Sequence, residues 1–408
     1  MHILYFHQHF TTPKGSTGIR SYTMARSLIA RGHKVTMVCG SFIGSKTGLS
    51  GEFIRGKRRG YVDGIDVIEL DLRYGNIDSF LKRTSTMLRY VIRSLAIALI
   101  EKHDLVFATS TPLTAGIPGL FSRIIRNKPF VFEVRDLWPE LPKKMGVISN
   151  PIILGLMSLL EWVSYRFAGH VIALSPGIVE GVRKRGVHDK KITLVPNGCD
   201  LEMFSKQQAG WRPPEVGDQD FLALFSGTHG VANGLDKVMD AAEELKNRRR
   251  NDIKIILIGQ GKTKEELIQR SRKLRLDNVI FLDPVEKEKL AGLMSESDIG
   301  LQVLANVPAF YYGTSPNKFF DYISAGLPVL NNYPGWLAEL ILEHDCGFVV
   351  QADDPCAFAD SLELAAADKV SLKAKGVNAR NLASRHFDRK SLASAWIDVL
   401  EDEFKRKR

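Results

Sequence analysis

Short apolar runs that alternate with amphipathic stretches limit most strongly how this chain can fold, and the alternation occurs twice. Stretches such as 21–31, with apolar residues on one face, separate the runs. Strands that alternate with helices predict a parallel sheet covered by helices on both faces. The expected strands of the first half are 2–6, 34–39, 66–70, 105–108, 129–134, 170–174 and 192–195, and those of the second half are 221–226, 254–258, 278–282, 299–303, 328–331 and 347–350.

The repeat of the pattern predicts an α/β protein with two doubly wound, Rossmann-like domains, 1–205 and 206–388. A polar stretch with proline and glycine, 206–219, is typical of an interdomain linker. The last helical pattern, within 389–408, predicts a helix that packs back on the first domain. Because such sheets bind ligands at the carboxyl ends of their strands, we expect the site in a cleft between the two domains.

Composition and cysteine usage exclude several other classes of protein. Of the 408 residues, 44% are hydrophobic and 25% are charged, as in an ordinary globular chain. The 4 cysteines are scattered, which argues against a zinc site or a disulfide scaffold and favours a reducing cytoplasm. No apolar run is long enough to span a bilayer, and the first residues are typical of a buried strand rather than of a signal peptide.

Positive charge is concentrated in the first half of the sequence. Residues 1–200 contain 28 Lys and Arg against 15 Asp and Glu, whereas residues 201–408 contain 28 against 31. This asymmetry suggests an anionic partner for the first half, namely nucleic acid, an anionic membrane or a phosphorylated substrate, although a solvated basic surface would look the same. Nucleic acid is disfavoured because the basic residues are dispersed and no aromatic residues are interleaved with them.

A glycine-containing loop follows the first expected strand and precedes a helix. It contains Gly15, Ser16, Gly18 and Arg20. Glycines allow close approach of the backbone to a ligand, and a helix N-terminus offers N–H groups to an anion, so the loop is a candidate phosphate site. The spacing differs from the dinucleotide fingerprint, which argues against an oxidoreductase. A flexible turn is the alternative.

A similar loop occupies the same place in the second half, and its residues are predicted to bind phosphate groups. His229 could bind a phosphate or only cap the turn. Lys262, which follows a Gly-x-Gly after the next strand, could supply a cation or be a solvated lysine. The loop residues concerned are Gly227, Thr228, His229, Gly230 and Asn233.

A third segment combines a helix start with a carboxylate. Ser315 is expected as the N-cap and Pro316 as the first helical residue, so that the helix N-terminus, with Asn317 and Lys318, faces the ligand. Asp321, farther along this helix, could chelate the two hydroxyls of a ribose. A surface aspartate on a helix is the alternative.

Taken together, several segments resemble family-4 glycosyltransferases, which are retaining enzymes with the two-domain GT-B fold. The segments are 173–175, 194–204, 276–282, 297–300 and the Asp321 helix with its ending Ala-Gly-Leu-Pro-Val. Residues 132–139 resemble the subgroup that builds bacterial surface polysaccharides, including O-antigen fucosamine transferases. Many members have two glutamates eight positions apart, and here Asp321 stands at the later position and Gly313 at the earlier one.

The resemblance implies transfer of a sugar from a nucleoside diphosphate sugar, preferably UDP-linked, with retention at the anomeric carbon. Lys318 or Lys262 would stabilise the leaving diphosphate, and no metal or other cofactor is expected. On the acceptor side, Asp136 could bind or deprotonate a hydroxyl, with Glu133 beside it, or Asp136 could only pair with Arg135. A nucleotide-sugar epimerase or a phosphorylase of the same fold, or a basic nucleic-acid-binding protein, are the alternative functions.

Two apolar stretches raise the question of a membrane. Residues 151–162 are strongly apolar, and 81–100 mix apolar residues with four basic ones, as an interfacial helix does. A sugar acceptor on a polyprenyl pyrophosphate, used at the inner face of the cell membrane, would explain both stretches. A helix that only covers the sheet is the alternative.

Overall fold

The computed structural model describes residues 1–16, 18–75, 78–204 and 209–407, and their contacts divide the chain into two compact units. Unit 1 consists of Met1–Pro196, Gly313–Ser315 and Lys390–Arg408, and unit 2 of Asn197–Tyr312 and Pro316–Arg389. The expected domain border at 205/206 and the start of the expected linker lie outside the described residues.

The sheet of unit 1 is parallel except at one edge, with the strand order β3-β4-β2-β1-β5-β6-β7-β8. Only β3 runs antiparallel to its neighbour β4. The strands are β1 (His2–Phe6), β2 (Lys34–Phe42), β3 (Lys57–Val62), β4 (Ile65–Tyr74), β5 (Leu105–Thr109), β6 (Phe130–Val134), β7 (His170–Ala173) and β8 (Ile192–Leu194).

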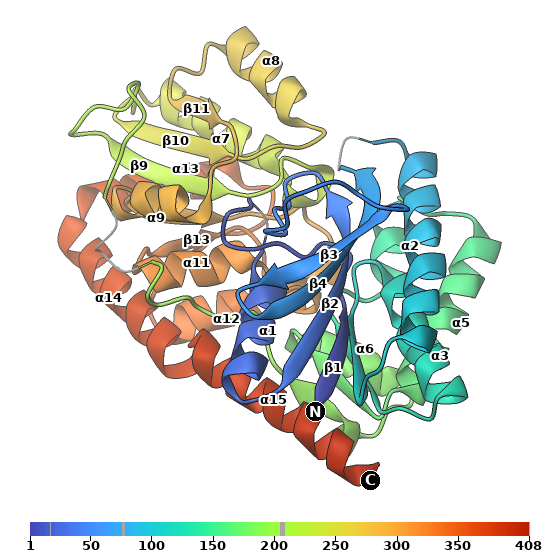
Figure 1. The fold of residues 1–408 in the computed structure, drawn as a ribbon. Helices are drawn as coiled ribbons and strands as arrows, with labels where there is room; N and C mark the ends of the chain where they lie inside the picture. The colour runs from blue at the N-terminus through green and yellow to red at the C-terminus, as the bar shows by residue number, and fades with distance from the viewer. Residues whose placement is uncertain (17, 76–77, 205–208, 408) are drawn as a thin grey trace. The chain divides into compact units, whose positions relative to one another are not determined.

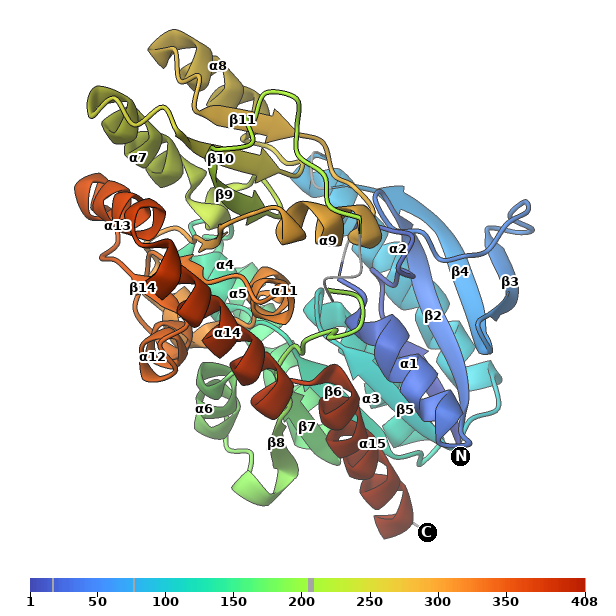
Figure 2. The same ribbon diagram turned by 90° about the vertical axis from the view of Figure 1, so that its left-hand side faces the viewer.

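Helices cover both faces of this sheet, which confirms the expected doubly wound arrangement. On one face lie α1 and α15, and on the other α2, α3, α5 and α6 (Figures 1 and 2). The helices are α1 (Arg20–Ala30), α2 (Phe80–Ile100), α3 (Ile117–Ile125), α4 (Glu140–Lys144), α5 (Pro151–Phe167), α6 (Pro176–Lys184) and α15 (Arg389–Arg406), with short 3-10 helices η1 (Leu113–Gly116) and η2 (Asp189–Lys191).

Unit 2 contains a second sheet in which every neighbouring pair is parallel, in the order β11-β10-β9-β12-β13-β14. Its strands are β9 (Phe221–Ser226), β10 (Ile253–Ile258), β11 (Val279–Leu282), β12 (Ile299–Gln302), β13 (Val329–Asn331) and β14 (Gly347–Val349). Its helices are η3 (Val231–Asn233), α7 (Leu235–Asn247), α8 (Lys264–Leu274), α9 (Lys287–Ser295), α10 (Pro308–Gly313), α11 (Asn317–Ala325), α12 (Trp336–Glu343), α13 (Pro355–Ala367) and α14 (Lys369–His386).

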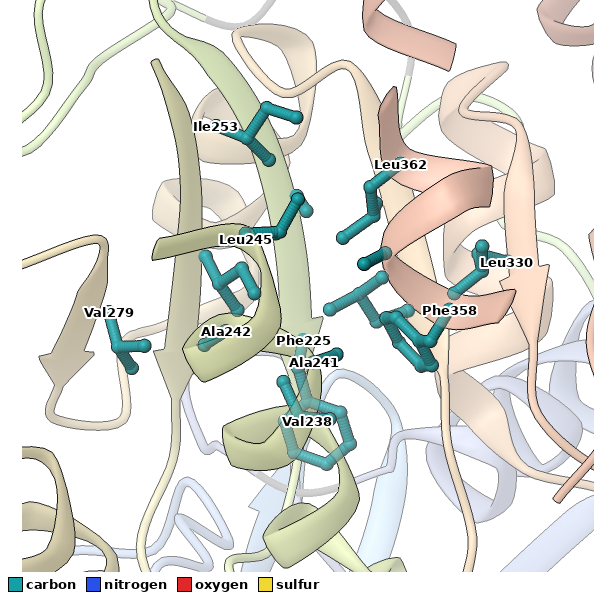
Figure 3. Packing of buried hydrophobic residues seen from close by; sticks show 14 of the residues in the cluster. Phe225, Val238, Ala241, Ala242, Leu245, Ile253, Val279, Leu330, Phe358 and Leu362 are labelled. Carbon is teal, nitrogen blue, oxygen red and sulfur yellow. The ribbon is translucent and has the colours of Figure 1, made fainter. Parts of the chain in front are cut away.

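The core of unit 2 forms where α7 and α13 pack on this sheet. Figure 3 shows Val238 and Leu245 of α7, and Phe358 and Leu362 of α13, against the strands. Leu245 and Leu362 are fully buried. Each such side chain contributes about 1.5–3 kcal/mol when it leaves water, so the apolar faces of these helices fix their place on the sheet.

Among the parallel strands of each sheet, successive strands are added in one direction up to a certain point and in the opposite direction after it. In unit 1 this point lies between β1 and β5, and in unit 2 between β9 and β12. The loops at the carboxyl ends of strands next to such a point diverge to opposite faces, and this is where open α/β sheets bind their ligands. The loops after these strands therefore position a site in each unit.

Several elements differ from the sequence-based expectation. The edge strand β3 and the helices α12 and α14 were not expected; β3, with the sequence Lys-Arg-Arg-Gly-Tyr-Val, is partly exposed and has no apolar run to indicate it. At α11, Pro316 is the N-cap and Asn317 the first helical residue, so Ser315 is not the cap. The expected end of this helix is confirmed by Gly326, which adopts the left-handed conformation with φ 71°.

The C-terminal helix α15 completes the core of unit 1, as the sequence predicts. Trp396 is fully buried, and its ring lies 4.7 Å from the ring of Phe107 on β5 and 6.1 Å from that of Tyr5 on β1. His33 and Glu401 form a second link between the body of unit 1 and this helix, with 2.9 Å between Nε2 and Oε1.

We expect Trp396→Ala to lower the free energy of unfolding of unit 1 by about 3–5 kcal/mol, because it empties a buried site that α15 fills. Urea unfolding followed by circular dichroism measures the change. Lys405→Ala, at an exposed position of the same helix, is the control and should change stability little. A loss below about 1 kcal/mol for Trp396→Ala would show that α15 is not part of the core.

Candidate functional site

In unit 2, the turn after β9 and the turn after β10 touch backbone to backbone. A Cβ atom on Gly259 would lie 1.8 Å from the carbonyl oxygen of Gly227, and one on Gly261 would lie 2.2 Å from that of His229. The amide of His229 also donates to the carbonyl of Gln260 at 3.1 Å. Glycine is therefore required at 259 and 261 by the packing of the two turns, which explains the Gly-x-Gly of the sequence.

The side chain of Lys318, from the first turn of α11, lies directly on the β9 turn. Its Nζ donates to Oδ1 of Asn233 at 2.8 Å and lies 3.9 Å from the centre of the Phe225 ring. A Cβ on Gly227 would be 3.4 Å from the same Nζ. Burial lowers the pKa of Lys318 to about 7. Within the described residues no carboxylate pairs with this amine, so its charge is only partly compensated.

Asn233 holds the turn and the lysine in place. Its Nδ2 donates to the carbonyl of Thr228 at 2.8 Å, while its Oδ1 accepts from Lys318. The side-chain amide is therefore engaged on both sides, and Asn233 is better described as a positioning residue than as a direct ligand. Gly234 follows in the left-handed conformation, with φ 55°, where the chain enters α7.

The ring of His229 is fully buried between the two glycine turns and near Phe225 and Phe281. Neither ring nitrogen has a hydrogen-bond partner in the described part of the chain. Burial, with the nearby charges of Lys264 and Lys318, lowers the pKa of His229 to about 4. The imidazole is therefore neutral at pH 7, and its contribution to the turn is shape rather than charge.

Of the other residues predicted to bind the donor, Thr228 and Gly230 belong to the turn after β9 and Lys262 to the turn after β10. Asn317 begins α11, whereas Ser315 belongs to unit 1. Thr228 and Lys262 are exposed, and Gly230, Ser315 and Asn317 are half-buried. The neighbouring Lys264, by contrast, is buried and donates to Oδ1 of Asp283 at 2.7 Å. Lys262 is thus the exposed lysine of the second turn, whereas Lys264 is buried and has a structural role.

Asp321 forms a buried ion pair that the sequence did not indicate. Its Oδ2 accepts from Nζ of Lys287 on α9 at 2.5 Å, and the exposed fractions of the two side chains are 5% and 11%. In the described residues only Oδ2 is engaged in this way, so Oδ1 can still accept from a ligand. The ion pair fixes the carboxylate on the inner face of α11.

In unit 1, Arg20 and Glu133 neutralise each other in the interior. Arg20 donates from Nη2 to Oε2 of Glu133 at 2.8 Å and from Nη1 to the carbonyl of Pro196 at 2.6 Å. Oε1 of Glu133 accepts from Thr109 at 2.8 Å. Both side chains are buried. This geometry departs from the expectation that Arg20 charges a phosphate loop and Glu133 flanks the acceptor, because each is committed to the framework.

The loop after β1 also packs mainly on its own neighbourhood. The amide of Ser16 donates to the carbonyl of Gly44 at 3.1 Å, and the amide of Gly15 to that of Thr12 at 3.0 Å. A Cβ on Gly15 would be 2.1 Å from Oγ1 of Thr11. Gly18 is half-buried and Ser16 exposed. The amides of Gly15 and Ser16 are therefore not available as a phosphate cradle, contrary to the expectation.

Asp136, in the loop after β6, sits in a polar cluster beside the strands at the switch point. Its Oδ2 accepts from Oγ1 of Thr111 at 3.0 Å, and no ion pair joins it to Arg135 among the described residues. Burial raises the pKa of Asp136 above its usual range. A carboxyl group whose pKa is raised is a better proton acceptor than an ordinary aspartate.

Sequence reasoning missed two histidines in this cluster. His7 and His9 follow β1, and the ring of His7 lies 3.4 Å from Nη1 of Arg135. His9 contacts the hydroxyl of Tyr74, and its pKa is lowered to about 4 by burial and by the charge of Arg135. The available signal was their position, because polar residues directly after a buried central strand fall at the carboxyl edge of the sheet.

Comparison with solved structures identifies the fold class. The chain resembles sucrose-phosphate synthase from Thermosynechococcus elongatus with a TM-score of 0.76 at 17% identity, covering 99% of both chains. WaaG, a glycosyltransferase involved in lipopolysaccharide biosynthesis, gives 0.70 at 17% identity, over 97% of this chain and 99% of that one. HepE from Anabaena, solved with UDP-glucose, gives 0.66 at 17% identity, over 98% and 100%. The fold is that of GT-B glycosyltransferases.

Family models then place the chain among the glycosyltransferases. Residues 16–198 match the glycosyl transferase 4-like domain, and residues 211–382 match the glycosyl transferases group 1. The two models together cover most of the chain, which therefore belongs to the glycosyltransferases. The expected resemblance is confirmed at the level of this enzyme class.

Curated relatives match over part of their length. D-inositol 3-phosphate glycosyltransferase from Xylanimonas cellulosilytica is 26% identical over 270 residues, which are 58% of this chain and 59% of that protein. N-acetyl-alpha-D-glucosaminyl L-malate synthase from Bacillus anthracis is 23% identical over 241 residues, 57% and 60%. The matches thus span about three fifths of these relatives.

We expect Lys287→Met to lower the free energy of unfolding of unit 2 by about 3–5 kcal/mol, because Asp321 would be left buried without its partner. Chemical denaturation of the variant measures the loss. Lys289→Met, at an exposed position of the same helix, is the matched control. The double variant Lys287→Met, Asp321→Leu should recover much of the loss, since both charges are then absent. Equal stability of Lys287→Met and Lys289→Met would contradict a structural role for the pair.

Proposed function

We propose that this protein transfers a sugar from a nucleoside diphosphate sugar, UDP-linked, to a sugar acceptor on a polyprenyl pyrophosphate, with retention of the anomeric configuration, in the synthesis of bacterial surface polysaccharide. The observation that carries the proposal is the amine of Lys318, which lies on a glycine turn at the switch point of unit 2 and pairs with no carboxylate of the described residues. Such an amine is suited to a phosphate group.

What is known of similar proteins supports the same chemistry. HepE was solved with UDP-glucose, and WaaG acts in lipopolysaccharide biosynthesis. TuaH from Bacillus subtilis, named a putative teichuronic acid biosynthesis glycosyltransferase, is 28% identical over 142 residues, which are 35% of this chain and 34% of that protein. These proteins make a nucleotide donor and a surface polysaccharide product the most economical assignment.

The chemical difficulty of the reaction is the leaving group, which departs with additional negative charge on the diphosphate. Lys318 would donate to a diphosphate oxygen. The first amides of α11, at the N-terminus of the helix, would also face this anion. Binding of the anion raises the pKa of the lysine, so the amine becomes fully charged where the charge is needed. We propose that no metal is required, on the basis of the family resemblance.

The nucleoside would be held by Asp321. Lys287 fixes Oδ2 of this carboxylate, and Oδ1 would accept from a ribose hydroxyl. Because the ion pair restricts the rotamer of Asp321, the carboxylate is already oriented when the nucleotide arrives, which lowers the entropic cost of binding. Lys262, which is exposed on the second turn, would contribute only long-range attraction to the phosphates.

On the acceptor side, Asp136 would accept the proton of the attacking hydroxyl. Burial raises the pKa of its carboxyl group despite the nearby charge of Arg135, and Thr111 fixes one of its oxygens. In a retaining transfer the departing phosphate can also accept this proton, so Asp136 would assist rather than be indispensable.

The experiment that tests the function has two parts. A thermal-shift screen with UDP-, GDP- and dTDP-sugars identifies the nucleotide, and a UDP-sugar should raise Tm most. Turnover with the selected donor and a polyprenyl-pyrophosphate sugar is then followed by NMR of the anomeric proton, which should show the donor configuration in the product. Incubation without acceptor separates a transferase from an epimerase, since only an epimerase converts the donor alone. Turnover should persist in EDTA.

We expect Lys318→Met to weaken UDP binding by about 10- to 100-fold, the value of a charge-assisted hydrogen bond, with stability retained. Lys262→Met should weaken it less than about threefold, because that amine is exposed to water and screened. Isothermal titration with UDP measures both. If Lys262→Met weakened UDP binding more than Lys318→Met did, Lys262 rather than Lys318 would be the main cation at the diphosphate.

The pH dependence of binding checks the same assignment. The amine with a pKa of about 7 is charged below pH 7 and neutral above it, and the anion stabilises the charged form. UDP affinity should therefore fall by up to about tenfold per pH unit above pH 7. Comparison of the wild-type profile with that of Lys318→Met removes the titration of UDP itself. Parallel profiles would show that Lys318 does not titrate with binding.

We expect Asp136→Asn to lower kcat by about 10- to 100-fold while UDP affinity stays within about twofold, because Asp136 acts on the acceptor in unit 1. Asp136→Glu should restore part of kcat. If kcat of Asp136→Asn were unchanged, the departing phosphate of the donor would be the proton acceptor. If UDP affinity fell instead, Asp136 would act on the donor rather than on the acceptor.

A further inference from the structure

Helix α5 is amphipathic in the inverted sense. Its inner side contains Glu161, Ser164 and Tyr165, which are buried, and Leu160 packs against the core. By contrast, Ile152, Leu156 and Leu159 are exposed. Glu161, its only acidic residue, points inward and pairs with Arg185 at 2.6 Å. A surface helix ordinarily shows the reverse pattern, with apolar residues inside and charges outside. The outer side of α5 is therefore built for an apolar environment.

The same property extends to the two helices beside it. Helix α3 contacts both α2 and α5 on one face of the unit 1 sheet, and Figure 1 shows the three together. In the described residues, more than half of the exposed large hydrophobic side chains lie on these helices. We call the following set the apolar face: Leu81, Leu88, Ile92 and Ile100 of α2; Phe121, Ile124 and Ile125 of α3; and Ile152, Ile153, Leu156, Leu159, Trp162 and Phe167 of α5.

The exposed charged residues of α2, α3 and α5 themselves are basic. Helices α2 and α3 contain no acidic residue, and Glu161 of α5 is buried. Arg89 on α2 and Arg166 on α5 are exposed. Arg93 donates to the carbonyl of Gly56 and Lys82 pairs with Asp78, so only part of the expected basic residues of α2 is free. A second copy docked through this face would oppose two positive surfaces, whereas an anionic surface complements them.

None of the helices that the structure describes is both long enough and apolar enough to cross a bilayer. We propose that the apolar face docks this protein on an anionic membrane, with α5 lying in the headgroup region and its leucines in the acyl boundary. Apolar burial and basic residues together are what interfacial binding requires. The inference deepens the proposed function, on which it rests for a lipid-linked acceptor, but the binding itself needs no donor or acceptor.

Flotation of the full chain with vesicles tests the docking. Vesicles of phosphatidylcholine with phosphatidylglycerol should carry the protein to the top of the gradient, and vesicles of phosphatidylcholine alone should retain less of it. Leu156→Asn with Leu159→Asn should lower the partition by tenfold or more. Both side chains are exposed, so folding should be kept. Leu364→Asn with Val370→Asn, equally exposed on unit 2, is the matched control and should float as the wild type does.

The charge contribution is tested separately. Arg89→Glu and Arg166→Glu should each lower binding to the anionic vesicles about fivefold, and added salt should lower wild-type binding in the same direction. UDP titration of every variant shows whether the donor site is intact, so failure to float and failure of the proposed function remain distinguishable. Equal flotation of the Leu156, Leu159 variant and its control would overturn the proposal. So would a concentration-dependent dimer in sedimentation that this variant abolishes, because a second copy would then cover the face.

Discussion

Two turns of unit 2 lie so close together that no side chain fits between them, and the arrangement of the donor site depends on this contact. The backbone of Gly259 and Gly261 rests on that of Gly227 and His229. Because the turns end neighbouring parallel strands, their contact fixes the edge of the sheet as a rigid backbone surface. The side chain of Lys318 reaches this surface from α11, which makes it the candidate cation of the site.

The environment of Lys318 differs from that of the other buried lysines of unit 2. Lys264 pairs with Asp283, and Lys287 with Asp321. Those lysines have their counter-charge within the protein and serve as structural links. Lys318 has a neutral amide and an aromatic ring instead, and its depressed pKa of about 7 follows from that difference. The amine of Lys318 is therefore only partly protonated near pH 7, and a bound anion would stabilise its charged form.

Local patterns in the sequence predicted the elements and the class of fold, but they could not predict which distant side chains pair. The Gly-x-Gly after β10 was visible, whereas its contact with the β9 turn depends on strand order. Arg20 and Glu133 are 113 positions apart and were expected at a ligand; the buried ion pair between them forms only when the fold brings the first residue of α1 to a side chain of β6. The position of Asp321 on its helix was predicted, and its partner Lys287, from another helix, was not.

Helix α5 shows why an apolar sequence does not by itself indicate burial. Its Pro-Ile-Ile-Leu-Gly-Leu-Met stretch is as apolar as a core segment, yet its residues are exposed or half-buried. The contacts of the helix with the core come from the residues that follow, Leu160 and Tyr165 among them. Asn150 caps the helix by accepting from the amides of Ile152 and Ile153, so its start is fixed by hydrogen bonds rather than by packing of the leucines. The inner side of α5 thus contributes to the stability of the fold, whereas its outer side forms an exposed apolar surface. The outer side contributes little to the core and is free to serve an interface, which would be costly for an ordinary amphipathic helix whose apolar residues hold the domain together.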